Sequence, residues 1–307
     1  MGSVIRRILF SPNEPRFRAG WRILAHFGMM FGAVIVLTVG VIVVHLLGVQ
    51  ILTSLLVNQL ALFIAINASV PLARWLLDQR SFVSLGLSRR RALPDLLAGI
   101  VIAGLVMGAI FVTEWRLGWL RVEAAGWPAG PSGWSELSVW FIIFVIVGWQ
   151  EELLTRGYWL QNIAEGLNLP LGVVLSSAMF ALIHISNPNV SWIAITGLFF
   201  AGLFLASGYL FTRQLWLPIG LHIGWNFFEG NVFGFEVSGL ETFRLIHTTV
   251  NGPEIWTGGM FGPEAGLIVI PAMILGVGVM WGYVRMTRRT KEIGPTQDGQ
   301  ARGLPLP

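Results

Sequence analysis

The stretch "GWQEELLTRGYW", residues 148–159, decides how the rest of this sequence must be arranged. It places two adjacent carboxylates and an arginine after the apolar run Val139–Val147. Near the centre of a membrane helix, one charged side chain costs roughly 2.5–3.5 kcal/mol, whereas a large apolar residue returns only about 0.3–0.6 kcal/mol. Nine apolar residues therefore do not offset three charges. We expect Glu151, Glu152 and Arg156 to face a bundle interior, a water-filled cavity or the cytoplasmic interface rather than lipid.

Composition indicates that the chain is a membrane protein. Of its 307 residues, 54% are hydrophobic and 12% are charged, whereas a soluble domain has about 25% charged residues. A bilayer span needs about 20 apolar residues, and such stretches recur along the sequence. We predict an all-α fold, a polytopic membrane helix bundle of about eight transmembrane helices. The expected spans are roughly 21–47, 51–77, 93–113, 135–163, 169–187, 191–212, 215–231 and 265–286.

Basic residues gather at alternate connections between these spans. Arginines are concentrated before the first span, around residues 74–91 and after the last span, whereas the connection 232–264 is mixed to acidic. Cytoplasmic loops carry the excess of Lys and Arg, so we predict both termini on the inner side of a bacterial or archaeal cytoplasmic membrane. Single cysteines at Gly239 (outside) and Ser88 (inside) would report this orientation.

Other features of the composition exclude several kinds of site and partner. The chain has no cysteine, which excludes disulfides, thiolate metal sites and a cysteine nucleophile. The net charge of +4 comes from arginines in loops, and its placement indicates topology rather than nucleic-acid binding. Small-xxx-small pairs such as Gly28/Gly32 and Gly220/Gly224 are expected to let helices approach closely.

The polar residues of three expected spans form one candidate site. Glu152 and Arg156 are spaced i,i+4 and can pair on one helix face, whereas Glu151 points about 100° away, which suits a general base. His184 lies within the apolar stretch "MFALIHISN", and His222 and Asn226 share a face of the seventh span. Because each group needs a polar neighbour, we expect one shared interior site that can activate water and bind an oxyanion. An interfacial ion-pair cluster remains the alternative for the charges at 151–156.

These motifs resemble those of the CAAX prenyl endoprotease and bacteriocin-processing (CPBP, or Abi) family of intramembrane proteases. The family's E-E-x-x-x-R resembles Glu151 to Arg156, its F-x-x-x-H resembles Phe180 to His184, and its H-x-x-x-N resembles His222 to Asn226. Their order and spacing also agree, and the resemblance covers about residues 135–231. It implies a bundle of about eight helices whose site opens to the cytoplasmic side.

The resemblance also implies roles for individual residues. Glu151 would be the general base on the attacking water, and His184 would help to hold that water. His222 and Asn226 would bind the developing oxyanion, while Glu152 and Arg156 would position the base. The implied partner is a peptide or a membrane-associated protein substrate, and the sequence predicts no nucleic-acid partner.

The choice between metal-dependent and metal-independent hydrolysis stays open in the sequence. Two histidines and a glutamate form a common catalytic zinc set, so zinc is possible, with Glu151, His184 and His222 as its ligands. Because His222 has Asn226 as its i,i+4 partner and no H-E-x-x-H motif is present, we expect a site without metal or other cofactor.

This reading divides the chain into a bundle with two flanking segments. Residues 1–20 form a basic cytoplasmic segment, residues 21–290 form the transmembrane bundle with its catalytic core at about 135–231, and residues 291–307 form a disordered cytoplasmic tail. The resemblance implies an intramembrane endopeptidase that hydrolyses a peptide bond near the cytoplasmic membrane face with a glutamate-activated water, and two other functions remain open. One is a non-enzymatic protein of the same fold, acting as an immunity factor or scaffold, and the other is a transporter with a proton relay.

Overall fold

The computed structural model describes residues 2–11, 16–47 and 54–288, and nearly all of their regular structure is helical. This confirms the predicted all-α membrane bundle. The predicted tail, residues 291–307, lies outside the described residues. The α-helices are α1 Gly2–Leu9, α2 Ala19–Leu46, α3 Ser54–Leu76, α4 Ala92–Arg116, α5 Gly130–Glu152, α6 Leu160–Gly166, α7 Leu169–Leu182, α8 Trp192–Thr212, α9 Trp216–Asn226, α10 Glu254–Thr257 and α11 Val269–Arg288.

Two segments of π-helix interrupt the regular pattern, and each begins directly after a predicted site residue. The first, Leu153–Trp159, follows Glu152 and joins α5 to α6 without a break. The second, Phe227–Val232, follows Asn226 at the end of α9. The π-helix is rare and is found frequently at functional sites.

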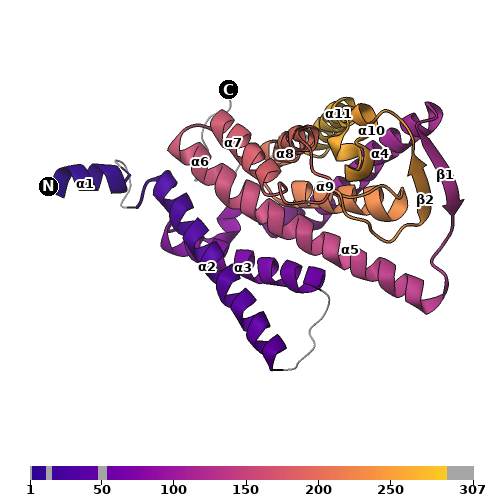
Figure 1. Cartoon of the computed structure of the whole chain (residues 1–307). Coiled ribbons are helices and arrows are strands. Elements are labelled where there is room, and N and C mark those ends of the chain that lie inside the picture. Colours follow the sequence, from indigo (N-terminus) through magenta and orange to yellow (C-terminus); the bar gives the residue numbers. More distant parts are fainter. Residues whose placement is uncertain (1, 12–15, 48–53, 289–307) are drawn as a thin grey trace.

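Helix α5 is the axis of the bundle (Figure 1). It runs across the whole molecule, with the α2–α3 hairpin on one side and α4, α8, α9 and α11 on the other. Almost none of the apolar stretch of α2 is buried inside the protein. In a chain of this composition, such a surface is suited to lipid contact.

Six of the described helices, or helix runs, are long and apolar enough to cross a bilayer. The expected fifth and seventh spans fall short of this length. Helix α7 has 14 residues and ends before His184, where the chain turns. Helix α9 has 11 residues, and every one from Leu217 to Asn226 is buried among its neighbours. Helix α9 therefore lies in the interior of the bundle, whereas α7 buries one face and exposes Leu171, Val174 and Leu175 on the other.

Backbone-to-backbone packing fixes α9 against α4. A Cβ atom built on Gly220 would lie 2.0 Å from the carbonyl oxygen of Leu96, and one on Gly224 would lie 2.7 Å from the Cα of Ile100. Only glycine allows the two helices to approach this closely, as the small-xxx-small spacing predicts. Gly28 and Gly32 on α2 make no such approach, because a Cβ there would meet no described atom within 4 Å.

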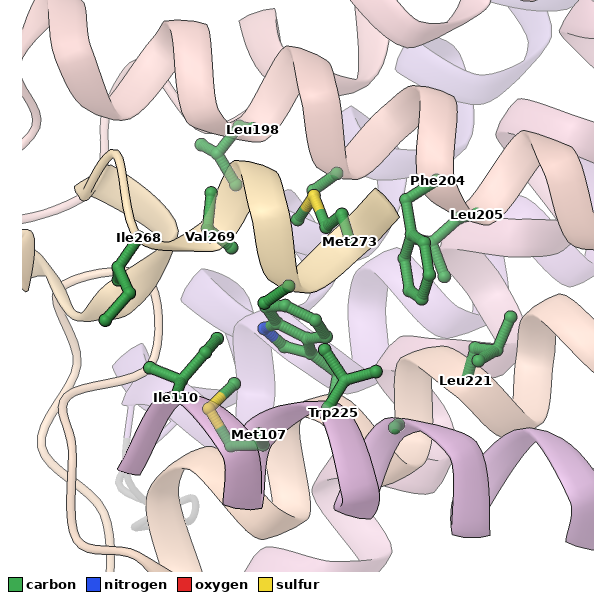
Figure 2. Packing of buried hydrophobic residues seen from close by; sticks show 14 of the residues in the cluster. Met107, Ile110, Leu198, Phe204, Leu205, Leu221, Trp225, Ile268, Val269 and Met273 are labelled. Carbon is green, nitrogen blue, oxygen red and sulfur yellow. The ribbon is translucent and has the colours of Figure 1, made fainter. Parts of the chain in front are cut away.

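A hydrophobic core lies behind α9 and closes this side of the bundle (Figure 2). The indole of Trp225 lies between Met107 and Ile110 of α4 and Val269 and Met273 of α11. The ring is 5% exposed. Since Trp225 immediately precedes Asn226, this packing also fixes the orientation of the site helix.

The connection 114–134, expected to be an aromatic belt at the interface, also contains a strand. β1 (Leu120–Ala125) pairs antiparallel with β2 (Ile246–Val250), with a register shift between Val122 and Ala124. The exposed rings of Trp127 and Trp134 stack 6.0 Å apart beside it. The sheet joins two long connections that are distant in sequence, so the periodicity of neither segment predicts it.

The opposite end of the bundle is held by ion pairs, of which those of Asp78 are buried. Asp78 accepts from Arg22 of α2 and Arg74 of α3, each at 2.8 Å. Glu165 of α6 pairs with Arg22 at 2.9 Å and also with Arg80. This network joins α2, α3 and α6 at the end of the molecule that we predict to face the cytoplasm.

We expect cysteine labelling to place the termini inside, but the structure changes the choice of probe positions. Gly239 is unsuitable because it is buried and has a φ of +82°, and a Cβ there would lie 2.1 Å from the carbonyl oxygen of Pro188. Gly126 is exposed beside β1 with open space at its Cβ position, and Arg90 is exposed at the opposite end. Gly126→Cys should react with an impermeant reagent added outside intact cells, whereas Arg90→Cys should react only after lysis. The reverse pattern would contradict the predicted orientation.

Candidate active site

The last turn of α5 delivers two carboxylates to the centre of the bundle. Gly148 lets α5 cross α9 closely, because a Cβ there would lie 3.1 Å from the backbone nitrogen of Ile223. One turn later, Glu151 and Glu152 lie beside the ring of His222. The crossing of the two helices therefore brings the first and third sequence motifs together.

Glu152 is the centre of a buried cluster. Its Oε1 accepts from Arg156 Nη1 at 2.8 Å, the ion pair expected from the i,i+4 spacing, and from His222 Nδ1 at 2.9 Å. Arg156 also donates to the carbonyl oxygen of Gly202 at 2.8 Å and to Thr155 Oγ1 at 2.8 Å. The side chains of Glu152 and Arg156 are both fully buried. Neither can reach a substrate, so their geometry suits positioning.

Glu151 occupies a different environment, at the edge of a cavity. Its Oε2 lies 3.8 Å from His184 Nε2 and 3.9 Å from His222 Nε2. These distances are too long for direct hydrogen bonds, and Oε2 has no hydrogen-bond partner among the described residues. The side chains of Glu151 and His184 are 15% and 13% exposed. At this separation, a hydrogen-bonded link between the carboxylate and the histidine requires a bridging group such as water.

The hydrogen bonds of both histidines indicate which ring nitrogen carries the proton. His184 Nδ1 lies 2.9 Å from the carbonyl oxygen of Phe180, and a carbonyl can only accept, so Nδ1 is the donor. His222 Nδ1 donates to Glu152 in the same way. In the neutral rings, both Nε2 atoms then present a lone pair toward Glu151. His222 Nε2 becomes a donor only when the ring carries two protons.

The ring of Phe180 packs the three basic side chains together. Its centroid lies 5.0 Å from the His184 ring and 5.9 Å from the His222 ring, and the Arg156 guanidinium lies 4.5 Å above it. The first residue of the F-x-x-x-H motif therefore acts as a packing surface for the rest of the site. An aromatic face favours a cation above it, which suits the buried arginine.

Asn226 completes the group on the wall of a cavity of about 390 Å³. Glu151, His184, His222 and Asn226 all line it. The rest of the lining is mainly apolar and comes chiefly from α2, α3 and α5, with further residues from the π-helical segment after α5, from α7 and α8, and from the connections that follow α7 and α9. The structure thus brings all six predicted site residues into one place, with Glu152 and Arg156 behind the four that reach the cavity.

In their observed positions, Glu151, His184 and His222 fit a zinc ion poorly. Tetrahedral ligands at about 2.0–2.1 Å from zinc lie roughly 3.4 Å apart, whereas the carboxylate and imidazole atoms are 3.8 and 3.9 Å apart. Within the described ranges, no group of three His, Asp or Glu residues is arranged to hold a metal ion.

Two parts of the site could not be found from the motifs. Glu264, from the turn Pro263–Ala265 before α11, lines the same cavity, and Ser238 binds its carboxyl. Glu264 is recognisable in the sequence only as one of several acidic residues near a long connection. Gly202 contributes its backbone carbonyl oxygen, which accepts from Arg156. Any residue type has such a carbonyl, so the sequence does not indicate this role.

Comparison with known proteins supports the resemblance seen in the motifs. Residues 133–228 match the family model described as Rce1-like, type II CAAX prenyl endopeptidase. Neither a curated protein nor a solved structure matches the chain significantly. The match spans the three motifs and supports, in general terms, a CAAX-protease-like intramembrane endopeptidase.

Proposed function

We propose that this membrane protein, whose residues 133–228 belong to the Rce1-like family, hydrolyses peptide bonds with a water activated by Glu151. The observation that supports this most is the unpartnered Glu151 Oε2, which lies 3.8 Å from the lone-pair nitrogen of His184 on a side chain that lines the cavity. Two acceptors at this separation can each take one hydrogen from the same water. The oxygen of that water is then held with a lone pair free to attack.

In the proposed reaction, the water oxygen bonds to the carbonyl carbon while its proton passes to Glu151. The electrons of the C=O bond move to the oxygen, which Asn226 stabilises through its amide N–H. When the C–N bond breaks, the leaving nitrogen takes the proton from Glu151, and the base is regenerated. Every proton is accounted for without another reactant.

The surrounding residues hold this geometry. Glu152 fixes the ring of His222, and Arg156 fixes Glu152 through the 2.8 Å ion pair. His222 assists as a donor when it is doubly protonated, a state that the two neighbouring carboxylates favour. The apolar walls suit an extended peptide with apolar side chains, which belongs to a peptide or membrane-associated protein substrate.

Purified protein in detergent should cleave a labelled apolar peptide at one bond, and it should do so in the presence of a strong chelator. The expected result is a single cleavage and a rate unchanged by chelator, because the water is activated by a carboxylate. Metal analysis of the same active sample provides the control. Stoichiometric zinc whose removal abolishes activity, and whose return restores it, would overturn the metal-independent mechanism.

Asn226→Ala should lower kcat by about 10²–10³-fold, the usual effect of losing one oxyanion donor, with KM changed little. The amide is needed mainly when charge develops on the carbonyl oxygen. Steady-state kinetics on the same peptide would show the split. Normal kcat with a greatly raised KM would instead place Asn226 in ground-state substrate binding.

A further inference from the structure

Glu264 reaches the candidate site from outside the three motifs and outside the matched segment 133–228. It lines the cavity of about 390 Å³ together with Glu151, His184, His222 and Asn226. It also lines a second cavity of about 20 Å³, whose lining includes His222 and Asn226. A third carboxyl-bearing residue therefore borders the cavity that the four candidate catalytic residues line.

The backbone around Glu264 is fixed by close contacts. A Cβ on Gly197 of α8 would lie 1.8 Å from the carbonyl oxygen of Glu264. Gly262 has a φ of +105°, and a Cβ there would lie 2.2 Å from the carbonyl oxygen of Glu236. Such conformations and approaches require glycine. The turn is thus built to hold Glu264 in one position.

The burial of Glu264 favours its neutral, protonated form and outweighs the opposite effect of Ser238, His184 and His222. The residue is 5% exposed, its Oε2 is bound to Ser238, and it has no Arg or Lys partner among the described residues. Two other carboxyl groups are near. Fully buried Glu229 lies against Gly262, which precedes Glu264 by two residues in the sequence, and Glu151 lines the same cavity as Glu264. Burial raises the pKa of the Glu264 carboxyl above its ordinary value. An uncompensated buried carboxylate is costly, whereas a protonated one is a hydrogen-bond donor.

The site needs such a donor. Glu151 Oε2 and the neutral His184 Nε2 are both acceptors, and His222 Nε2 donates only when its ring is doubly protonated. Asn226 is then the sole unconditional donor among the four predicted site residues that line the cavity. We propose that Glu264 is a further catalytic residue, whose protonated carboxyl donates a hydrogen bond to the developing oxyanion alongside Asn226. This rests on the proposed peptidase function. The proton stays on Glu264, and a neutral carboxylic acid in an apolar site is a known form of oxyanion donor.

The first test compares two substitutions at this position on the labelled peptide. Glu264→Leu removes the donor and should lower kcat by about 10²–10³-fold with KM nearly unchanged. Glu264→Gln keeps an N–H donor of similar size and should retain activity within about tenfold of wild type, well above the Leu variant. Glu241→Gln, an exposed acid on the preceding connection, is the control and should behave as wild type. Near-wild-type turnover in Glu264→Leu, or equal losses in both variants, would overturn the inference.

The second test does not depend on activity. Infrared spectra of the wild-type protein at neutral pH should show a carboxylic-acid C=O band that is lost in Glu264→Gln and kept in Glu241→Gln. A band unaffected by Glu264→Gln would mean that Glu264 is ionised, and the donor role would fail. If wild-type protein cleaves no peptide at all, the proposed function fails and the oxyanion role falls with it. If wild type is active and Glu264→Leu equals it, only the inference about Glu264 fails.

Discussion

Glu151→Gln should abolish peptide cleavage, with a loss of about 10²–10⁴-fold, the range that a general acid–base residue contributes. Glutamine keeps the size and hydrogen-bonding reach of the side chain but cannot take a proton from water. Because the oxygen that we assign to catalysis makes no protein hydrogen bond among the described residues, folding should be unaffected. Single-turnover assays on detergent-purified protein would measure the loss.

A matched control separates chemistry from charge. Glu241→Gln removes an exposed carboxylate on a connection of the same protein and should leave cleavage unchanged. Thermal unfolding of both variants should match wild type. Wild-type turnover in Glu151→Gln would remove Glu151 from the mechanism, even if the protein proved to be a peptidase.

Arg156→Met should have the largest effect on stability, lowering the free energy of unfolding by about 3–5 kcal/mol, as expected when a buried ion pair loses one partner. Glu152 would keep His222 as a neighbour but lose its cation, and the carbonyl of Gly202 would lose its side-chain donor. Denaturant unfolding in detergent would measure the change. Activity should fall as well, because Glu152 would no longer hold His222 in place.

Two further variants make this prediction specific. Glu152→Gln should cost less stability than Arg156→Met, since Arg156 keeps Gly202 and Thr155 as acceptors. The double variant Glu152→Gln/Arg156→Met should lose less free energy of unfolding than the two single variants lose together, because no charge of this pair is left buried without a partner. Additive losses would show that the pair is not coupled.

The sequence was most informative where charge and polarity interrupt apolar segments. The cost of placing Glu151, Glu152 and Arg156 in lipid predicts an interior site, and the structure places all three inside the bundle. The i,i+4 spacing of Glu152 and Arg156 likewise predicts a pair that is present at 2.8 Å. Both inferences need only local spacing and the cost of burying charge, which a sequence contains.

Features that arise from contacts between distant segments were not predictable. The π-helical turns at Leu153–Trp159 and Phe227–Val232 leave no distinct periodicity. The expected span 169–187 was too long, because the apolar run continues past Leu182 although α7 ends there. Glu264 reaches the site only because Gly197 and Gly262 allow its turn to approach α8 and the preceding connection. Nothing near Glu264 in the sequence shows where that turn packs.

The close packing of α9 on α4 also bears on how the protein is made. Helix α9 is too short to be recognised as a span by length, and it fits the bundle through backbone contacts of Gly220 and Gly224 with α4. During synthesis, α4 leaves the ribosome well before α9, so its docking surface already exists when α9 emerges. Glu151 and His184 are translated before His222 and Asn226, and Glu264 follows later still. Under the proposed mechanism, the water-activating residues are therefore translated before the oxyanion donors, and we expect no peptide cleavage until α9 and the turn that carries Glu264 have joined the bundle.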